Sequence, residues 1–70
     1  MSKGKLRIYT GTIGCIYETI DYNGYRGWLT NNVTGDVYKI KSIVNSSFPL
    51  DTGDTVTYLL DGKVAINVKA

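Results

Sequence analysis

Hydrophobic and polar positions alternate through most of the chain, and this repeat of two predicts strands rather than helices. The clearest runs are residues 25–30 and 36–41, in which aromatic, aliphatic and β-branched side chains are interleaved with Arg, Thr and Lys. Such residues suit the pleated, half-buried surface of a sheet. Residues 31–36 between them contain Asn, Gly and Asp, which tolerate the backbone angles of a tight reversal. The pattern therefore predicts a β-hairpin.

A long first strand is predicted before this hairpin. Residues 5–20 form one apolar–polar run whose phase changes between Gly11 and Gly14. Glycines inside a strand mark bulges or sharp bends, so we expect a single, strongly bent strand. Residues 21–24 then form a turn.

Two further strands are predicted after the hairpin. Residues 45–54, where Ser, Asn, Pro, Gly and Asp cluster, are expected to form a surface loop. Residues 55–60 form a strand, Asp61-Gly62 is a strong hairpin signal, and residues 63–69 form the closing strand. Strict alternation in that strand assigns its side chains to two opposite faces: Val64, Ile66 and Val68 on one, and Ala65, Asn67 and Lys69 on the other.

The expected fold class is all-β. A chain of 70 residues makes one small domain, residues 1–70, that buries only about 60% of its unfolded surface. Five strands, the first bent and the last two tightly connected, predict a small antiparallel barrel, closed or nearly closed. An SH3-like barrel competes on strand count alone. Residues 1–4 are expected to be disordered.

Composition argues against catalysis. The chain has no histidine, the commonest general acid–base. Cys15 therefore lacks an activating histidine and is expected to act as a small hydrophobe. The six acidic residues mostly stand beside Gly or Asn in turns, and no Cys or His cluster suits zinc. We expect a binding module with no catalytic residue, metal, cofactor or small-molecule substrate.

The single cysteine cannot form an internal disulfide, and no apolar run approaches the ~20 residues of a membrane span. The basic N-terminus leads into an alternating segment rather than an apolar signal core. A cytoplasmic protein without a membrane partner is expected. The net charge of +2 permits a polyanionic partner without requiring one.

The hairpin combines cationic and aromatic side chains on one face, Arg26 and Trp28 together with Tyr38 or the neighbouring lysines. This is the combination that single-stranded nucleic acid requires, because charges follow the phosphates and rings stack on the bases.

The chain also resembles the cold-shock proteins. The similarity runs in order over about residues 10–69, which makes it more specific than any one motif. The matching segments are Gly11-Thr12-Ile13 for Gly-Thr-Val, Gly27-Trp28-Leu29-Thr30 for Gly-Phe-Ile-Thr, Asp36-Val37-Tyr38 for Asp-Val-Phe, residues 50–56 for Leu-x-x-Gly-x-x-Val, and Asn67-Val68 for the closing Asn-Val. The resemblance implies a five-stranded OB barrel that binds single-stranded RNA or DNA.

The departures from the family fall in its binding motifs. Its stacking tryptophan in the first strand corresponds to Cys15, and its Lys-Gly-Phe corresponds to Gly24-Tyr25-Arg26. Its histidine corresponds to Ile40, and the following aromatic to Lys41. Only Trp28 and Tyr38 remain as rings at matching positions. The predicted nucleic-acid-binding residues are Trp28, Tyr38, Arg26, Lys39, Lys41, Phe48 and Tyr17, with Tyr25 as a further nearby candidate.

Two orientations are left open by the residues themselves. Trp28 is expected to face outward because Leu29 is the better core residue, although strand tryptophans are often buried. Lys39 and Lys41 share a face; if they are exposed, Tyr38 and Ile40 point inward, whereas the family alignment implies the reverse. Arg26 suits either a solvated surface or a phosphate contact.

Two functions compete. Trp28, Tyr38 and four positive charges (Arg7, Arg26, Lys39 and Lys41) favour a weak binder of single-stranded nucleic acid. The lost stacking rings and Ile40 on the former binding face favour a protein-interaction module. We expect nucleic acid as the partner, with a protein partner as the alternative, because fold alone does not decide.

Overall fold

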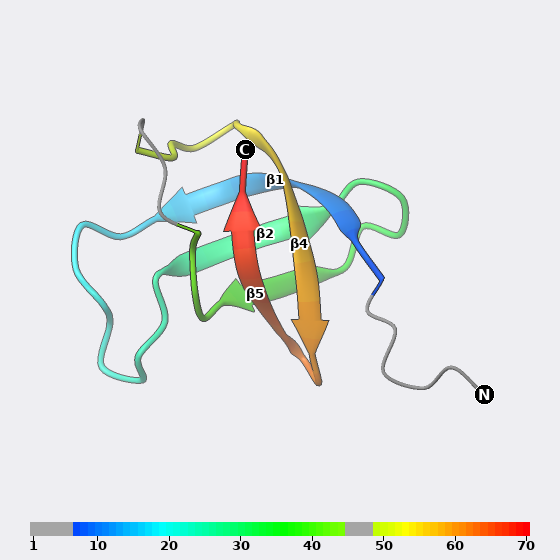
Figure 1. Cartoon of the computed structure of the whole chain (residues 1–70). Coiled ribbons are helices and arrows are strands. Elements are labelled where there is room, and N and C mark those ends of the chain that lie inside the picture. Colours follow the sequence, from blue (N-terminus) through cyan, green and yellow to red (C-terminus); the bar gives the residue numbers. More distant parts are fainter. Residues whose placement is uncertain (1–6, 45–48) are drawn as a thin grey trace.

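The computed structural model describes residues 7–44 and 49–70. In this part the chain is all-β, and its strands close a barrel in the order β1-β2-β3-β5-β4. In Figure 1, β1 and β2 lie beside the green β3, and β4 and β5 cross them. This is the predicted small OB-like barrel. The five strands are β1 (Tyr9–Ile16), β2 (Gly27–Asn31), β3 (Val37–Ile40), β4 (Thr55–Asp61) and β5 (Val64–Lys69).

One of the five strand pairings is parallel. β3 meets β5 through Lys39 with Val64 and Ile40 with Ala65, whereas the other four pairs are antiparallel as expected. A parallel pair needs a long connection, and here that connection contains β4. The contact continues past β3, where the backbone N–H of Lys41 donates to the carbonyl of Ala65 at 2.7 Å. In the same described residues, no helix has the length and apolarity that a membrane crossing requires.

The core is a single apolar cluster to which all five strands contribute. Leu29, Ile40, Ala65 and Val68 have no exposed surface at all. Burying each of the larger apolar side chains contributes about 1.5–3 kcal/mol to the stability of the folded state. This contribution offsets the conformational entropy that so small a domain loses on folding. The buried members are Ile13, Leu29, Ile40, Val56, Tyr58, Ala65 and Val68.

The first strand is bent, as predicted, but shorter. Its pairing with β2 shifts register between Ile13 and Cys15, which is a β-bulge at Gly14. Residues 7, 8 and 17–20, expected to belong to the strand, lie outside it, and residues 5 and 6 fall outside the described part. The bulge lets Ile13 and Ile16 both pack on the core, although they stand three residues apart.

The last strand corrects the predicted alternation. Ala65 and Val68 are buried, whereas Val64 and Ile66 are only partly so. The phase changes at Asn67, whose φ of 52° places a non-glycine residue in the left-handed region. Strict alternation fails because the β4–β5 ladder also shifts register between Thr57 and Leu59. The two strands thus coil together around the end of the barrel.

The β2–β3 turn is organised by one buried amide. The side chain of Asn31, 5% exposed, donates from Nδ2 to the Tyr58 hydroxyl at 2.7 Å. Its Oδ1 accepts from the backbone N–H groups of Val33 at 2.8 Å and Thr34 at 2.9 Å. The side chain therefore both caps the predicted turn and ties it to the core, and its polar atoms are satisfied despite burial.

We expect Asn31→Ala to lower the free energy of unfolding by about 2–3 kcal/mol, because it leaves the Tyr58 hydroxyl and two turn N–H groups without this partner. The matched control is Asn32→Ala, which removes only an exposed side-chain bond from Thr12 and should cost at most about 1 kcal/mol. Urea denaturation of the two variants measures the difference. Equal losses would contradict the buried role of Asn31.

Three tyrosines gather where this amide enters the core. The ring of Tyr58 stacks on that of Tyr9 at 5.6 Å between centroids and lies tilted against that of Tyr38 at 6.1 Å. Burial raises the pKa of Tyr58 and outweighs the hydrogen bond from Asn31, which acts in the opposite direction. Burial, followed by the Asp36 carboxylate, also raises the pKa of Tyr38.

This raised pKa predicts a loss of stability in alkali. The unfolded chain releases the Tyr58 proton near its ordinary pKa of about 10, before the folded chain does. The contribution of Tyr58 is thus complete below that pH and declines as pH rises toward the folded pKa. Urea unfolding across this range should show a steeper decline for the wild type than for Tyr58→Phe. Parallel declines would show that Tyr58 titrates alike in both states.

Candidate binding face

The outer face of β1, β2 and β3 brings together most of the predicted binding residues. In β2, Leu29 is fully buried, so its neighbour Trp28 faces outward, as predicted, and is half-buried. Across the ladders, Trp28 pairs with Cys15 of β1 and with Lys39 of β3. The ring therefore sits in the middle strand of a three-stranded surface, with a cation directly beside it.

The indole of Trp28 lies flat across β1. A Cβ built on Gly14 would fall on the six-membered ring of the indole, close to Cζ3 and almost as close to both ring atoms bonded to it. The Gly14 Cβ position is almost equally far from these three ring atoms, so it lies above the face of the ring and not beyond its edge. One face of the indole thus rests on the Gly14 backbone, and the opposite face points away from the barrel. Gly14 is what makes this flat arrangement possible.

Gly27 allows β2 to approach β1 closely. It is buried with a φ of 149°, and a Cβ there would meet the carbonyl oxygen of Cys15. The close approach is therefore to β1 and not to a ligand. The unusual backbone also interrupts the alternation, so residues before Gly27 do not continue the in–out order of β2.

A tyrosine and two lysines form a second group on this face. The Nζ atoms of Lys39 and Lys41 lie over the ring of Tyr25, at 5.3 and 5.7 Å from its centroid. Both lysines are exposed and Tyr25 is half-buried. Because Lys39 also pairs with Trp28, the indole and the two ammonium groups belong to one continuous surface.

The register of β3 is decided in favour of exposed lysines. Ile40 has no exposed surface, and Tyr38 packs on the core beside Tyr58. The expectation from the family alignment that Tyr38 faces the ligand with Trp28 is therefore wrong in its geometry: the two rings lie on opposite faces of the sheet. The same result removes Ile40 from the outer face.

The remaining predicted residues lie at one end of this face or outside the described chain. Arg26 is exposed; its N–H donates to the carbonyl of Ile40 at 2.8 Å, and its carbonyl accepts from the N–H of Tyr17 at 2.9 Å. These bonds place Arg26 between the ends of β1 and β3, opposite Tyr17, which lies just past the end of β1 and is 37% exposed. Phe48 lies outside the described residues.

The sequence does not single out Gly14 as part of the face, and it offers Tyr25 only as a nearby candidate whose orientation the strand pattern leaves open. The signal at Gly14 is a glycine on the outward side of a strand next to a large ring. At Tyr25 the order of the chain misleads, because the in–out alternation breaks at Gly27. Its place among the lysines follows from the Asp21–Gly24 turn, in which Asp21 Oδ1 accepts from the N–H groups of Asn23 and Tyr25, both at 2.8 Å.

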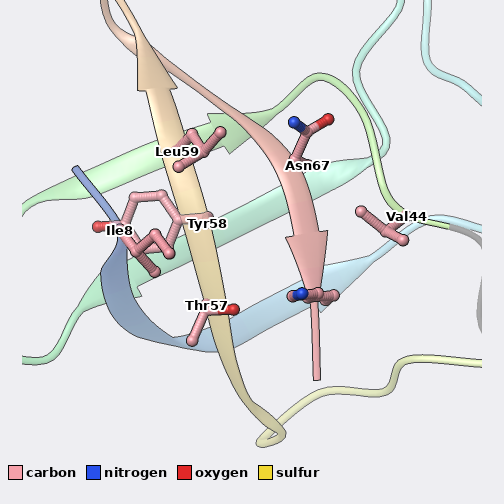
Figure 2. A pocket seen from close by; sticks show the side chains of 7 residues that line it. Ile8, Val44, Thr57, Tyr58, Leu59 and Asn67 are labelled. Carbon is pink, nitrogen blue, oxygen red and sulfur yellow. The ribbon is translucent and has the colours of Figure 1, made fainter. Parts of the chain in front are cut away.

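Among the described residues, no three His, Cys, Asp or Glu side chains come together as metal ligands. A shallow hollow of about 180 Å³ lies over β4 and β5 (Figure 2). None of the predicted binding residues lines it. Its walls come from Ile8, Val44, Thr57, Tyr58, Leu59, Asn67 and Lys69.

Comparison with known proteins adds nothing to this geometry, because no family model, curated protein or solved structure gives a significant match. The candidate face is thus defined by its own residues: Trp28 on Gly14, and Lys39 and Lys41 over Tyr25.

We expect Gly14→Ala to lift the indole from β1, because the new methyl group occupies the space of the ring while Trp28 is free to move outward. Tryptophan emission should shift to longer wavelength and iodide quenching should rise. Gly35→Ala is the control: a Cβ there meets nothing within 4 Å, and the strain of an alanine at its φ of 81° acts on the β2–β3 turn and not on Gly14. Unchanged emission in Gly14→Ala would mean that the indole does not rest on Gly14.

Proposed function

We propose that the outer face of β1, β2 and β3 binds single-stranded nucleic acid weakly, with Trp28 as the stacking platform. The observation that carries the proposal is the indole lying flat on Gly14 with its other face directed outward. A ring held in this way presents a π surface to a base at low cost in side-chain entropy. Base–aromatic stacking contributes about 1–3 kcal/mol per base and accepts any base.

The lysines supply the complementary charge. Lys39 stands beside Trp28 in the ladder, Lys41 follows on the same face of the chain, and Arg26 lies at the end of the surface. Phosphates alternate with bases along a single strand, so a ring flanked by cations matches its repeat. With a single indole as the proposed stacking platform, most of the affinity comes from charge and falls as salt rises.

A protein partner remains the second candidate because apolar side chains are exposed on β3 and in the β1–β2 connection. Val37 of β3 is 59% exposed, and Ile20 and Tyr22 in the β1–β2 connection are 55% and 102% exposed. Exposed apolar surface around an aromatic residue is typical of protein docking sites. The argument from Ile40, however, no longer supports this candidate, since that residue is in the core.

Binding is tested by fluorescence anisotropy of labelled oligo-dT and oligo-rU at low and physiological salt. We expect Trp28→Ala to weaken binding about 5- to 150-fold, the equivalent of one lost stacking contact. Because Trp28 lies outside the core, its truncation should cost much less stability than the ~3–5 kcal/mol of a buried aromatic residue. Urea unfolding of the same variant checks this.

Two further variants complete the experiment. Trp28→Phe keeps a smaller ring and should retain part of the affinity, whereas Tyr22→Ala removes a fully exposed ring from the β1–β2 connection and should leave oligonucleotide binding unchanged. If the wild type binds neither oligonucleotide at low salt, the nucleic-acid proposal fails and protein docking takes its place.

A further inference from the structure

We infer that Tyr25 is a positioning residue for the two lysines of the face. Its ring holds both ammonium groups near each other, so that they are already in position when a nucleic-acid backbone binds. The inference rests on the proposed function and deepens it. It assigns Tyr25 a role different from that of Trp28, since the ring acts on cations of the protein itself and not on a base.

The geometry brings two like charges to one ring. Lys39 and Lys41 are two residues apart on an extended chain, about 7 Å along the backbone, and their Nζ atoms lie 5.3 and 5.7 Å from the Tyr25 centroid. Two ammonium groups repel each other, and each long stem has many rotamers. An aromatic ring within about 6 Å attracts both cations and so opposes their separation.

A ring serves this purpose better than a carboxylate would. A carboxylate near two lysines neutralises part of their charge and competes with an incoming phosphate for the same N–H donors. The tyrosine ring is uncharged, so it restricts the ammonium groups without cancelling their charge. Because the two lysine side chains are ordered before binding, the entropy cost of ordering them does not reduce the affinity for the ligand.

The ring itself is held by the turn before β2. The Tyr25 N–H donates to Asp21 Oδ1 at 2.8 Å, and the Asp21 N–H donates to the Tyr25 carbonyl at 2.8 Å. Gly24, with a φ of 88°, makes this turn possible. The next N–H, of Arg26, donates to the Ile40 carbonyl between the two lysines. The ring is thus fixed relative to the very segment that carries the ammonium groups.

The decisive comparison is Tyr25→Leu against Tyr25→Phe, measured as affinity for labelled oligo-dT over a series of salt concentrations. Phe keeps the ring face and should bind as the wild type does. Leu keeps apolar bulk but removes the ring face, and should weaken binding about 3- to 10-fold. The dependence of log affinity on log salt should stay the same in both, because the lysines remain.

Lys39→Gln and Lys41→Gln supply the contrast. Each removes a phosphate contact, so each should lower the salt slope by about 0.7. This split distinguishes a residue that arranges charges from one that carries them. If Tyr25→Leu binds like the wild type, or changes the salt slope as the lysine variants do, or if Tyr25→Phe loses as much affinity as Tyr25→Leu, the inference is overturned. A wild type that does not bind oligo-dT overturns the proposed function instead.

A measurement on the unmodified protein covers the case in which Tyr25→Leu fails to fold. The face of an aromatic ring shields nearby protons, so the side-chain CεH₂ resonances of Lys39 and Lys41 should lie upfield of those of Lys63, an exposed residue in the β4–β5 turn. Resonances of all three lysines at one position would show that the ammonium groups do not rest on Tyr25, and would overturn the inference without any variant.

Discussion

The bulge at Gly14 is the constraint on which both the core and the outer face depend. Ile13 and Ile16 stand three residues apart, an odd spacing that strict alternation assigns to opposite faces, yet both pack on the core. The extra residue reconciles them. That extra residue is Gly14, which has no side chain, so the indole of Trp28 can lie flat over it on the outside. One local irregularity therefore directs two isoleucines into the core and supports the indole of Trp28 on the outside.

Much of the fold could be predicted because its signals are local. Glycines within the first strand predict the bulge, and Asn, Asp and Gly predict the turns at which Asn31 and Gly62 lie. Leu29 beside Trp28 was enough to orient β2, since one residue of each neighbouring pair must face the core. These features depend on chemistry within a few residues, which is the range over which a pattern can be interpreted without knowledge of the fold.

What could not be predicted depends on contacts between distant strands. Tyr38 and Lys39 are equally consistent with either face of β3, and the choice is made by Tyr58, twenty residues further on, against which Tyr38 packs. The phase of β5 is likewise set by its coiling against β4, where Asn67 adopts a positive φ. For Tyr25, the difficulty is that the alternation of β2 stops at Gly27, whose backbone approaches β1 closely. The alternation of β2 therefore does not predict which way the residues of the preceding turn face.

The distribution of charge explains why a net charge of only +2 is compatible with a binding face. Carboxylates are used by the turns: Asp21 Oδ1 accepts two backbone N–H groups, Asp51 Oδ1 accepts that of Thr52, and Asp54 Oδ2 accepts that of Asp51. Lys39 instead projects from β3 beside the indole, and Lys41 follows just after the end of that strand. Because exposed charges act mainly within a Debye length of about 8–10 Å, a phosphate beside Lys39 responds to that lysine more than to the carboxylates of Asp51 and Asp54, which stand before β4 on the far side of β1. Turn chemistry, by holding the acids at the ends of the strands, leaves the central surface positive.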